Sequence, residues 1–233
     1  MKTAAIVLAA GKGTRLGGDI PKQYIEVNGK PVLVYCLESF EKSNVDEVII
    51  VTGADSMDYV RENIADRFNL KKVSAVISGG SERYYSVLYA LRYLSENGKP
   101  EHVLIHDGAR PYITADGINR MVEAVRKYGA AVAATLAKDT IKITDKDGFV
   151  LETTDRSVTW QVETPQCFEF AAIREAYEEI VGKDGGPEGN ITDDAGVYEM
   201  TYPDRKVKLV NTGSLNSKIT TAADLDYMRY IFR

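Results

Sequence analysis

The chain has 233 residues, of which 44% are apolar and 27% are charged, a composition typical of a soluble globular protein. Acidic residues outnumber basic ones by 34 to 29, which gives a formal net charge of −5. This balance argues against sequence-independent nucleic-acid binding, which needs a basic surface. No apolar run approaches the roughly 20 residues that span a bilayer, so we also expect no association with a membrane.

The cysteines and histidines narrow the chemistry further. Cys36 and Cys167 stand in apolar contexts without a CxxC pair, which excludes a disulfide framework and suits a reducing compartment. His102 and His106 are too few for a histidine-rich metal site, and they argue against a histidine-based triad. Met1 leads almost directly into a predicted strand, so we expect no signal peptide and a cytoplasmic location.

An unbroken apolar run at residues 4–9 predicts a first strand that is covered on both faces. Similar buried strands follow along the chain, with helical patterns between them, at residues 48–51, 73–77, 102–106 and 130–136. The connecting helices are expected to start at Pro31, near residue 56, and after the capping residues Ser81 and Thr114. This alternation predicts an α/β fold with an open, mostly parallel twisted sheet flanked by helices. We treat residues 1–233 as one domain.

Ligands of such sheets bind beyond the carboxyl ends of the strands. The loops that leave these ends are predicted at residues 10–23, 79–86 and 107–112, and all three carry charged residues or glycines. The pattern of residues and the expected position of a site therefore agree.

Residues 139–163 differ from the rest of the chain. Two short, half-polar strands are predicted at 140–144 and 149–153, joined through an Asp147-Gly148 turn. An isolated hairpin is marginally stable in water, so this segment must pack against something. It is either a protruding arm that holds a second copy of the chain or an edge hairpin that lies on its own sheet.

The C-terminal third returns to alternating elements. A helix is expected around residues 170–180, a strand at 207–210, and a last helix capped by Thr221. Asp193 and Asp194 follow Thr192 and present two interpretations, a second metal site or a helix cap that orders the neighbouring loop. The helix cap is the favoured one.

A glycine-rich loop, Ala9-Ala10-Gly11-Lys12-Gly13-Thr14-Arg15-Leu16-Gly17, follows the first strand. Glycines allow backbone amides to approach phosphate oxygens closely. The loop has no Walker A spacing, and Leu16 stands where a dinucleotide fingerprint needs its third glycine. Alone it predicts only a tight turn, but Arg15 and Lys22 flank it, and two cations beside backbone amides suit a triphosphate.

These residues, with Pro21-Lys22-Gln23, resemble the signature of sugar- and polyol-phosphate nucleotidyltransferases. Later segments are similar, in order, to the 2-C-methyl-D-erythritol 4-phosphate cytidylyltransferase family over nearly the whole chain: Gly79–Ser86, His106–Pro111, Asp139-Thr140, Asp155-Arg156, Thr164-Pro165-Gln166, Thr192–Ala195 and Lys218-Ile219-Thr220. The resemblance implies a Rossmann-like nucleotidyltransferase fold with a β-hairpin arm, residues 139–163, that joins a homodimer. It also implies transfer of CMP from CTP to a polyol phosphate, with Mg²⁺ and release of pyrophosphate, in the non-mevalonate route to isoprenoid precursors.

The resemblance assigns a role to each matching position. Three cations, Arg15, Lys22 and Lys218, would contact the triphosphate and stabilise the transition state. The nucleotide would be held by Ala9, Ala10, Gly11 and Gly13, and its cytosine by Gly80 and Ser86. Asp107 would bind Mg²⁺ and substrate, and the polyol phosphate would meet Arg110, Thr140, Arg156 and Thr164.

Some of these residues also have a purely structural alternative. Asp107 could be a loop or capping carboxylate, Ser86 a hydroxyl on a helix surface, and Arg156 an ion-pair partner of Asp155. The acceptor's phosphate oxygen is already an anionic nucleophile, so the reaction needs charge neutralisation rather than a general base. His106 is accordingly assigned a structural hydrogen bond.

The sequence is also compatible with two other functions. A ribitol-5-phosphate cytidylyltransferase would share the fold and the CTP site, although Asp155-Arg156 and Thr192–Ala195 favour the methylerythritol enzyme. A catalytically silent nucleotide-binding regulator could share the fold alone. The cations and the carboxylate Asp107 argue against that reading.

Overall fold

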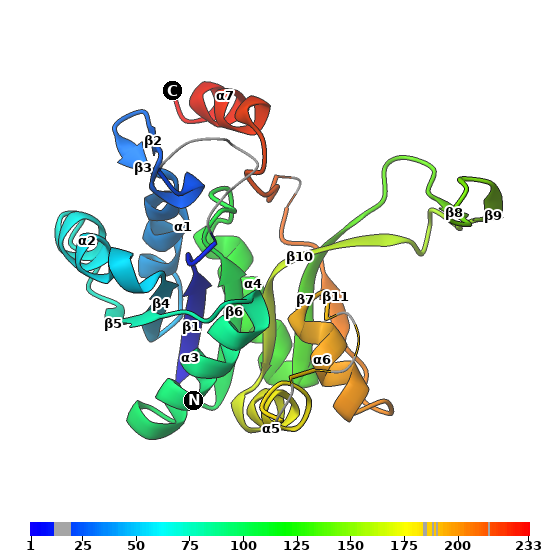
Figure 1. Ribbon diagram of the computed structural model, residues 1–233, viewed down its shortest axis with the longest axis horizontal. Coiled ribbons are helices and arrows are strands. Elements are labelled where there is room, and N and C mark those ends of the chain that lie inside the picture. The colour runs from blue at the N-terminus through cyan, green and yellow to red at the C-terminus, as the bar shows by residue number, and fades with distance from the viewer. Residues whose placement is uncertain (12–19, 184–185, 188, 190, 214) are drawn as a thin grey trace.

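A computed structural model describes residues 1–11, 20–183, 186–187, 189, 191–213 and 215–233. Its centre is a seven-stranded sheet with the order β11-β7-β10-β6-β1-β4-β5 (Figure 1). The strands are β1 (Thr3–Leu8), β4 (Glu47–Thr52), β5 (Val73–Ser78), β6 (His102–Asp107), β7 (Ala130–Leu136), β10 (Trp160–Glu169) and β11 (Lys208–Val210). Neighbouring strands pair in parallel except where β10 lies antiparallel to β6 and β7. The predicted open, mostly parallel α/β sheet is confirmed.

Helices cover both faces of the sheet, which explains the unbroken apolar strands. Alternate residues of β1 point to opposite layers, with Ala5 and Val7 in one core and Ala4 and Ile6 in the other. The first layer contains α1 (Val32–Glu41), the short α2 (Met57–Val60) with the π-helical turn that follows it (Arg61–Asp66), and α4 (Ala115–Tyr128). The second contains α3 (Arg83–Asn97), α5 (Phe170–Ile180) and α6 (Asp194–Thr201).

The predicted helix caps have different outcomes. The Thr114 hydroxyl accepts a hydrogen bond from the Gly117 amide, and Thr221 forms a capping box with Asp224 at the start of α7 (Ala222–Ile231), so both are confirmed. The prediction for Ser81 is wrong, because α3 begins at Arg83 after an extended Glu82. The Ser86 hydroxyl accepts a hydrogen bond from the Gly80 amide. This bond closes residues 80–82 into a loop and keeps Ser81 out of the helix.

The segment 139–163 forms an arm that extends away from the body (Figure 1). Its tip is a separate two-stranded sheet of β8 (Lys142–Thr144) and β9 (Val150–Thr153), so the alternative of an edge hairpin on the main sheet is wrong. The sequence did not predict β10, which begins in the arm and then inserts between β6 and β7. Its first residues, Trp160-Gln161-Val162-Glu163, alternate apolar and polar side chains, but they fall within the segment predicted to be the arm.

A third, smaller core joins the C-terminus to the body. The short hairpin of β2 (Glu26–Val27) and β3 (Lys30–Pro31) packs with α7, which contributes Leu225 and Met228. The segment between β11 and α7 is thereby drawn across the carboxyl edge of the sheet. No helix among the described residues combines the length and apolar character that crossing a bilayer requires.

Candidate active site

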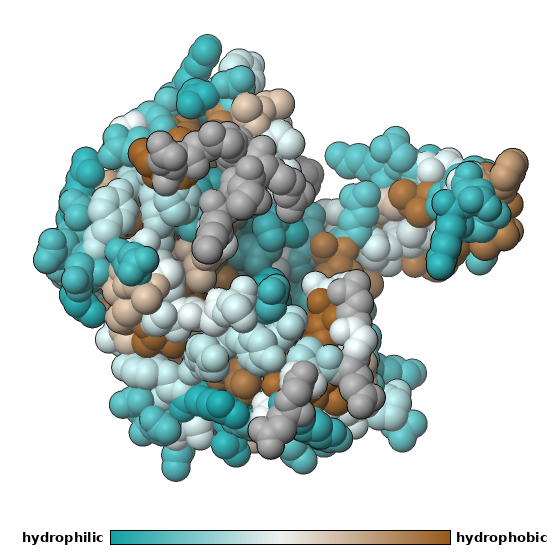
Figure 2. Space-filling view, in the orientation of Figure 1, coloured by the Kyte–Doolittle hydropathy of each residue, from teal (hydrophilic) through white to brown (hydrophobic). Residues whose placement is uncertain are grey.

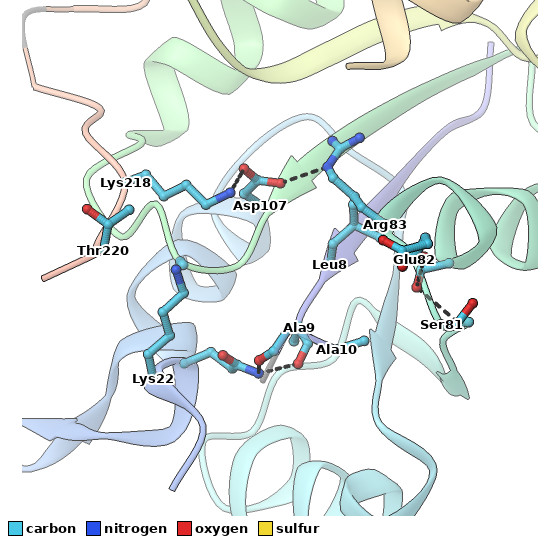
Figure 3. Close-up of a pocket in the computed structure, with 15 residues that line it drawn as sticks. Leu8, Ala9, Ala10, Lys22, Ser81, Glu82, Arg83, Asp107, Lys218 and Thr220 are labelled. Atoms are coloured by element: carbon cyan, nitrogen blue, oxygen red, sulfur yellow. Dashed lines mark hydrogen bonds and ion pairs between the residues drawn. The ribbon is translucent and has the colours of Figure 1, made fainter. Parts of the chain in front are cut away.

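Parallel pairing brings the ends of β1 and β6 together at one edge of the sheet. In the register of these strands Leu8 lies beside Asp107, the last residue of β6. A cavity of about 280 Å³ opens at this edge (Figure 3). It is lined by Leu8, Ala9, Ala10, Gly11, Lys22, Gln23, Gly80, Ser81, Glu82, Arg83, Ser86, Asp107, Ala109, Lys218 and Thr220.

Gln23 fixes the turn that leaves β1. Its buried side-chain amide donates to the carbonyl oxygens of Ala9 and Gly11, the second at 2.9 Å. The Ala9 amide donates to Val51 of the neighbouring strand at 2.7 Å, so the start of the turn remains tied to the sheet. The segment that carries Gln23 also carries Lys22, which is thereby held at the cavity.

The loop after β5 needs glycine because its backbone is crowded. A Cβ atom at Gly79 would lie 2.8 Å from the Ala10 Cβ, and one at Gly80 would collide with the Tyr85 side chain. The Ser86 hydroxyl accepts from the Gly80 amide at 3.0 Å and donates to the Glu82 carbonyl at 3.2 Å. Ser86 therefore fixes the loop backbone, and both Ser86 and the loop line the cavity.

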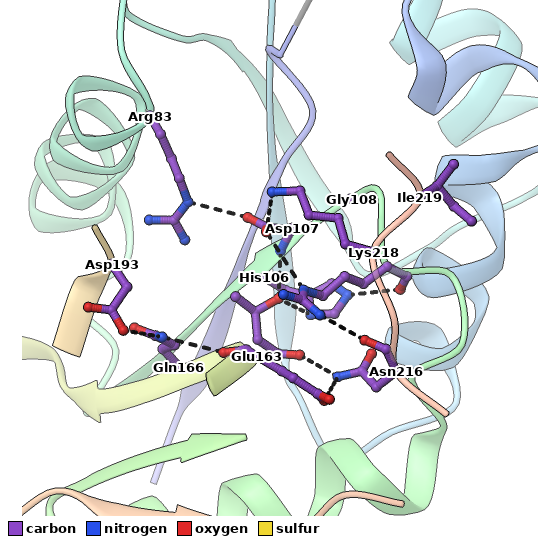
Figure 4. Close-up of polar contacts among 12 residues, drawn as sticks. Arg83, His106, Asp107, Gly108, Glu163, Gln166, Asp193, Asn216, Lys218 and Ile219 are labelled. Carbon is purple, nitrogen blue, oxygen red and sulfur yellow. Dashed lines mark hydrogen bonds and ion pairs between the residues drawn. The ribbon is translucent and has the colours of Figure 1, made fainter. Parts of the chain in front are cut away.

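Asp107 is the electrostatic centre of the site. Its side chain is 11% exposed and is surrounded by three cations (Figure 4). Arg83 Nε lies 3.3 Å from Oδ1, while Lys218 Nζ lies 2.8 Å and Arg110 Nε 3.7 Å from Oδ2. Burial alone would raise the pKa of this carboxyl group, but the three cations hold the pKa well below its usual range. Asp107 is therefore ionised at neutral pH.

Residues 215–220, here termed the strap, connect β11 to α7 without regular secondary structure. The Ile219 amide donates to the Ala109 carbonyl at 2.8 Å, and the Ile219 carbonyl accepts from Lys22 Nζ at 2.7 Å. The strap thus brings Lys218 to Asp107 and Lys22 to the same cavity (Figure 3). The two lysines come from opposite ends of the sequence.

Arg83 joins Asp107 to the N-terminus of α6. Its guanidinium makes two hydrogen bonds of 2.8 Å to the fully buried Asp194, which also accepts from the Tyr177 hydroxyl at 2.5 Å. Asp193 caps α6 by accepting from the Gly196 amide, so the favoured capping interpretation is confirmed. The described residues hold no group of three or more His, Cys, Asp or Glu side chains arranged to bind a metal ion.

His106 and Thr164 support Asp107 from within the sheet. The Thr164 hydroxyl accepts from the Asp107 amide at 3.0 Å and pairs with His106 Nδ1 at 3.1 Å. His106 Nε2 lies 3.2 Å from the Arg110 carbonyl, so both ring nitrogens are engaged. Burial lowers the pKa of His106 to about 4, which keeps the ring neutral at physiological pH. These contacts agree with the predicted structural role.

Comparison with known proteins decides the family. The profile of the 2-C-methyl-D-erythritol 4-phosphate cytidylyltransferases matches residues 3–233. The chain belongs to this cytidylyltransferase family. A member from Lachnospira eligens is 46% identical over 95% of both chains, and one from Lachnoclostridium phytofermentans is 41% identical over 100% of this chain and 97% of its own. The crystal structure of the 4-diphosphocytidyl-2C-methyl-D-erythritol synthase from Anaerococcus prevotii superposes with a TM-score of 0.86 at 31% identity, covering 100% of this chain and 96% of that one.

Most cytidylyltransferase positions predicted from the sequence meet at the cavity: Ala9, Ala10, Gly11, Lys22, Gly80, Ser86, Asp107 and Lys218. Arg110 and Thr164 contact Asp107 from beside and behind the cavity. Gly13 and Arg15 lie outside the described residues.

The arm residues Thr140 and Arg156 do not reach the cavity of their own chain. Both are exposed, and Arg156 donates to the Lys138 carbonyl at 3.2 Å. Asp155 bonds to Ser157 instead of Arg156. The proposed ion pair between Asp155 and Arg156 is therefore not formed among the described contacts.

The sequence analysis gave no role to Gln23, Arg83 or Thr220, although the structure places all three at the cavity. Each stands inside a segment that carried the family resemblance. Arg83 was detectable in principle, because it lies within the loop predicted at residues 79–86, at the carboxyl edge of the sheet. Its partner Asp194 is 111 residues away, and no local pattern reports that contact.

Lowering the pH should reduce the unfolding free energy, because the buried His106 ring resists protonation in the folded protein. Its pKa is about 4 in the folded protein and about 6.5 in the unfolded chain. The unfolded chain therefore takes up the proton first, and stability falls as the pH drops from 6.5 toward 4. His106→Gln should reduce the loss of unfolding free energy between pH 7 and 4.5 by about 2 kcal/mol, measured by denaturant titration. An unchanged loss in the variant would contradict this assignment.

Proposed function

We propose that the protein transfers CMP from CTP to 2-C-methyl-D-erythritol 4-phosphate and releases pyrophosphate. The product is 4-diphosphocytidyl-2-C-methyl-D-erythritol. The observation that carries this proposal is the convergence of Lys22, Lys218 and Arg83 on one cavity around the ionised Asp107. Membership of the cytidylyltransferase family supplies the two substrates.

The triphosphate of CTP fits the cationic part of the cavity. Lys22 and Lys218 enter from the loop after β1 and from the strap, so they bracket the space between these segments (Figure 3). The family resemblance also assigns Arg15 and Gly13, which lie outside the described residues, to contacts with the triphosphate and the nucleotide. The crowded backbone of residues 79–82 offers peptide groups to the edge of the cytosine, while Ser86 holds that backbone in place.

The reaction requires that the two substrates be positioned and that their negative charge be neutralised. An oxygen of the acceptor's phosphate attacks the α-phosphorus of CTP, the bond from that phosphorus to the bridging oxygen of the β-phosphate breaks, and pyrophosphate leaves with the electron pair. No proton must be removed from this nucleophile. The neutral His106 has both ring nitrogens engaged and serves no such purpose. Lysines and arginines reduce the repulsion between the two anions and stabilise charge in the transition state.

Asp107 fits a magnesium site of the single-carboxylate kind. Its oxygens are hard donors at the cavity wall, and Mg²⁺ commonly takes one or two protein carboxylates together with phosphate oxygens and water. When bound, the ion would neutralise charge on the triphosphate. Lys218 and Arg83 already hold both Asp107 oxygens, so they orient this carboxylate.

Arg110 is proposed to receive the acceptor's phosphate. Its Nε is buried without a hydrogen bond, and the nearest carboxylate oxygen lies 3.7 Å away. Nη1 donates to the Asn216 carbonyl at 2.8 Å, which fixes the guanidinium plane. An arginine held in this way offers a directional donor to a phosphate oxygen. Thr164 contributes by holding the Asp107 backbone, and Thr140 and Arg156 complete the pocket from the arm of a second chain.

The arm carries the apolar surface that a second copy would cover. Its exposed side chains include Phe149 at 72%, Val150 at 58% and Leu151 at 68% exposure (Figure 2). Such a patch on a short hairpin is characteristic of an interface. We therefore propose a homodimer in which Thr140 and Arg156 of one chain reach the other chain's site. The buried, unpaired Cys36 and Cys167 suit the reducing cytoplasm.

Pyrophosphate release tests the function directly. With CTP and Mg²⁺, 2-C-methyl-D-erythritol 4-phosphate should give pyrophosphate and a cytidine-containing product, measured by a coupled assay and mass spectrometry. Ribitol 5-phosphate should be the poorer acceptor in direct competition. Preference for ribitol 5-phosphate would establish the rival enzyme, and no turnover with either acceptor would leave only a nucleotide-binding regulator.

Removing either lysine should damage turnover without unfolding the chain. Lys22→Ala and Lys218→Ala should each lower kcat by roughly 10²–10³, because each removes a charge that stabilises the transition state. Lys42→Ala, at the exposed end of α1, is the matched control and should keep the wild-type rate. Wild-type turnover by Lys22→Ala would refute its role.

Deleting residues 141–152 should abolish both the dimer and the activity, because the arm supplies the interface and brings Thr140 and Arg156 to the partner. Sedimentation velocity should show a monomer. The double substitution Phe149→Asp and Leu151→Asp, at exposed positions, should give the same result with less change to the chain. A dimer of undiminished stability would rule out the arm as the interface.

A further inference from the structure

The strap is held at two points on either side of Lys218. On the C-terminal side Ile219 bonds to Ala109 and to Lys22. On the N-terminal side Asn216, a residue that is 3% exposed, anchors the strap by hydrogen bonds. Because this part of the chain forms no ladder or helix, the position of Lys218 depends on these individual hydrogen bonds and on the packing of Leu215 and Ile219 against the third core.

Asn216 uses both of its amide protons. Nδ2 donates to the Thr164 carbonyl at 2.7 Å and to Glu163 Oε2 at 3.0 Å (Figure 4). The backbone carbonyl of Asn216 accepts from Arg110 Nη1 at 2.8 Å, whereas its side-chain Oδ1 is buried without a hydrogen bond. Two acceptors on one side fix the orientation of the amide, since a flipped group would point its oxygen at two other oxygens.

Thr164 connects this anchor to the other partner of Lys218. Its carbonyl accepts from Asn216, while its hydroxyl accepts from the Asp107 amide at 3.0 Å. One residue of β10 therefore sets both the start of the strap and the backbone of Asp107. The two hydrogen bonds of Thr164 therefore help to keep Lys218 Nζ at 2.8 Å from Asp107 Oδ2.

Glu163 extends the connection to the root of the arm. Its Oε1 accepts from the Thr135 hydroxyl of β7 at 3.3 Å, and its Oε2 accepts from Asn216. It lies where the pairing of β10 with β7 changes register, between Val162 and Gln166. The ladder is interrupted there, so Glu163 joins the strap to both strands at the place where the arm leaves the sheet.

We propose that Asn216 is a positioning residue for Lys218. Together with Glu163, at the base of the arm, it forms a clamp that fixes the position of Lys218 relative to Asp107. The clamp acts through Lys218 and touches neither substrate. This inference rests on the proposed transfer reaction, which gives Lys218 its role at the triphosphate.

Asn216→Ala should lower kcat by about 10- to 100-fold, because Lys218 loses its fixed distance from Asp107. Asn216→Asp should be worse, since it sets a carboxylate against Glu163 and the Thr164 carbonyl. Glu163→Gln keeps an acceptor for Asn216 and should stay within roughly threefold of wild type, whereas Glu163→Ala should resemble Asn216→Ala. Asn119→Ala, on α4, removes the side-chain oxygen that accepts from the Asn44 backbone amide; it is the matched control and should leave kcat unchanged.

A double-mutant cycle separates positioning from general structural damage. In the Lys218→Ala background Asn216→Ala should cause no further loss beyond about twofold, because its effect passes through the absent lysine. The same loss in both backgrounds, or wild-type kcat in Asn216→Ala, would overturn the proposal. If Asn216→Ala fails to fold, Glu163→Ala, at a half-buried position, carries the same cycle.

Labelling of Lys218 keeps this test separate from the proposed reaction. Acetic anhydride with peptide mass spectrometry should modify Lys218 severalfold faster in Asn216→Ala than in wild type, since the amine is released from Asp107. This readout needs no turnover. Equal labelling rates would overturn the clamp even in an active enzyme, whereas an inactive wild type with faster labelling of the variant would overturn only the proposed reaction.

Discussion

A buried carboxylate cannot remain ionised without compensation, and Asp107 is such a group at the carboxyl edge of the sheet. Arg83, Arg110 and Lys218 surround it from α3, from the loop after β6 and from the strap. Each cation is also held by a second contact: Arg83 binds Asp194 and Arg110 binds the Asn216 carbonyl. Lys218 is carried by the strap, which is itself bonded to Ala109. Removing one partner of a buried charged group is costly, so this carboxylate ties together three parts of the chain that are distant in sequence. Of the cations it gathers, Lys218 is proposed to meet the triphosphate and Arg110 the acceptor's phosphate.

The fold serves this arrangement by fixing the backbone beneath it. The register between β1 and β6 sets Leu8 beside Asp107, and Gln23 then directs the turn that carries Lys22. The antiparallel β10 brings Thr164 behind Asp107 and continues into the arm. A single strand therefore contributes to the site of its own chain and to the proposed contact with the next one. The proposed dimer contact and the geometry of the cationic site thus share one structural element.

The sequence predicted those features that local patterns report. Buried strands and the caps at Thr114 and Thr221 follow from composition and short-range hydrogen bonding, and the motif positions around Lys22, Asp107 and Lys218 indicated the cavity. It failed where long-range contacts decide. Ser81 was wrong as a cap because Ser86 bonds to the loop that precedes the helix. β10 was missed because it begins inside the segment predicted to be the arm and because its pairing with β6 and β7 is long-range. Arg83 and Asn216 act through partners that no spacing in the sequence reveals.

We propose that the site recognises the triphosphate of CTP by its charge, and the affinity for nucleotides tests this proposal. Calorimetry with CTP and CMP in the presence of Mg²⁺, at low and at high ionic strength, compares the same base and sugar with different charge. CTP should bind at least roughly 100-fold more tightly than CMP at low salt, and this difference in affinity should become smaller as salt screens the cations. Equal affinities for the two nucleotides, unaffected by salt, would contradict it.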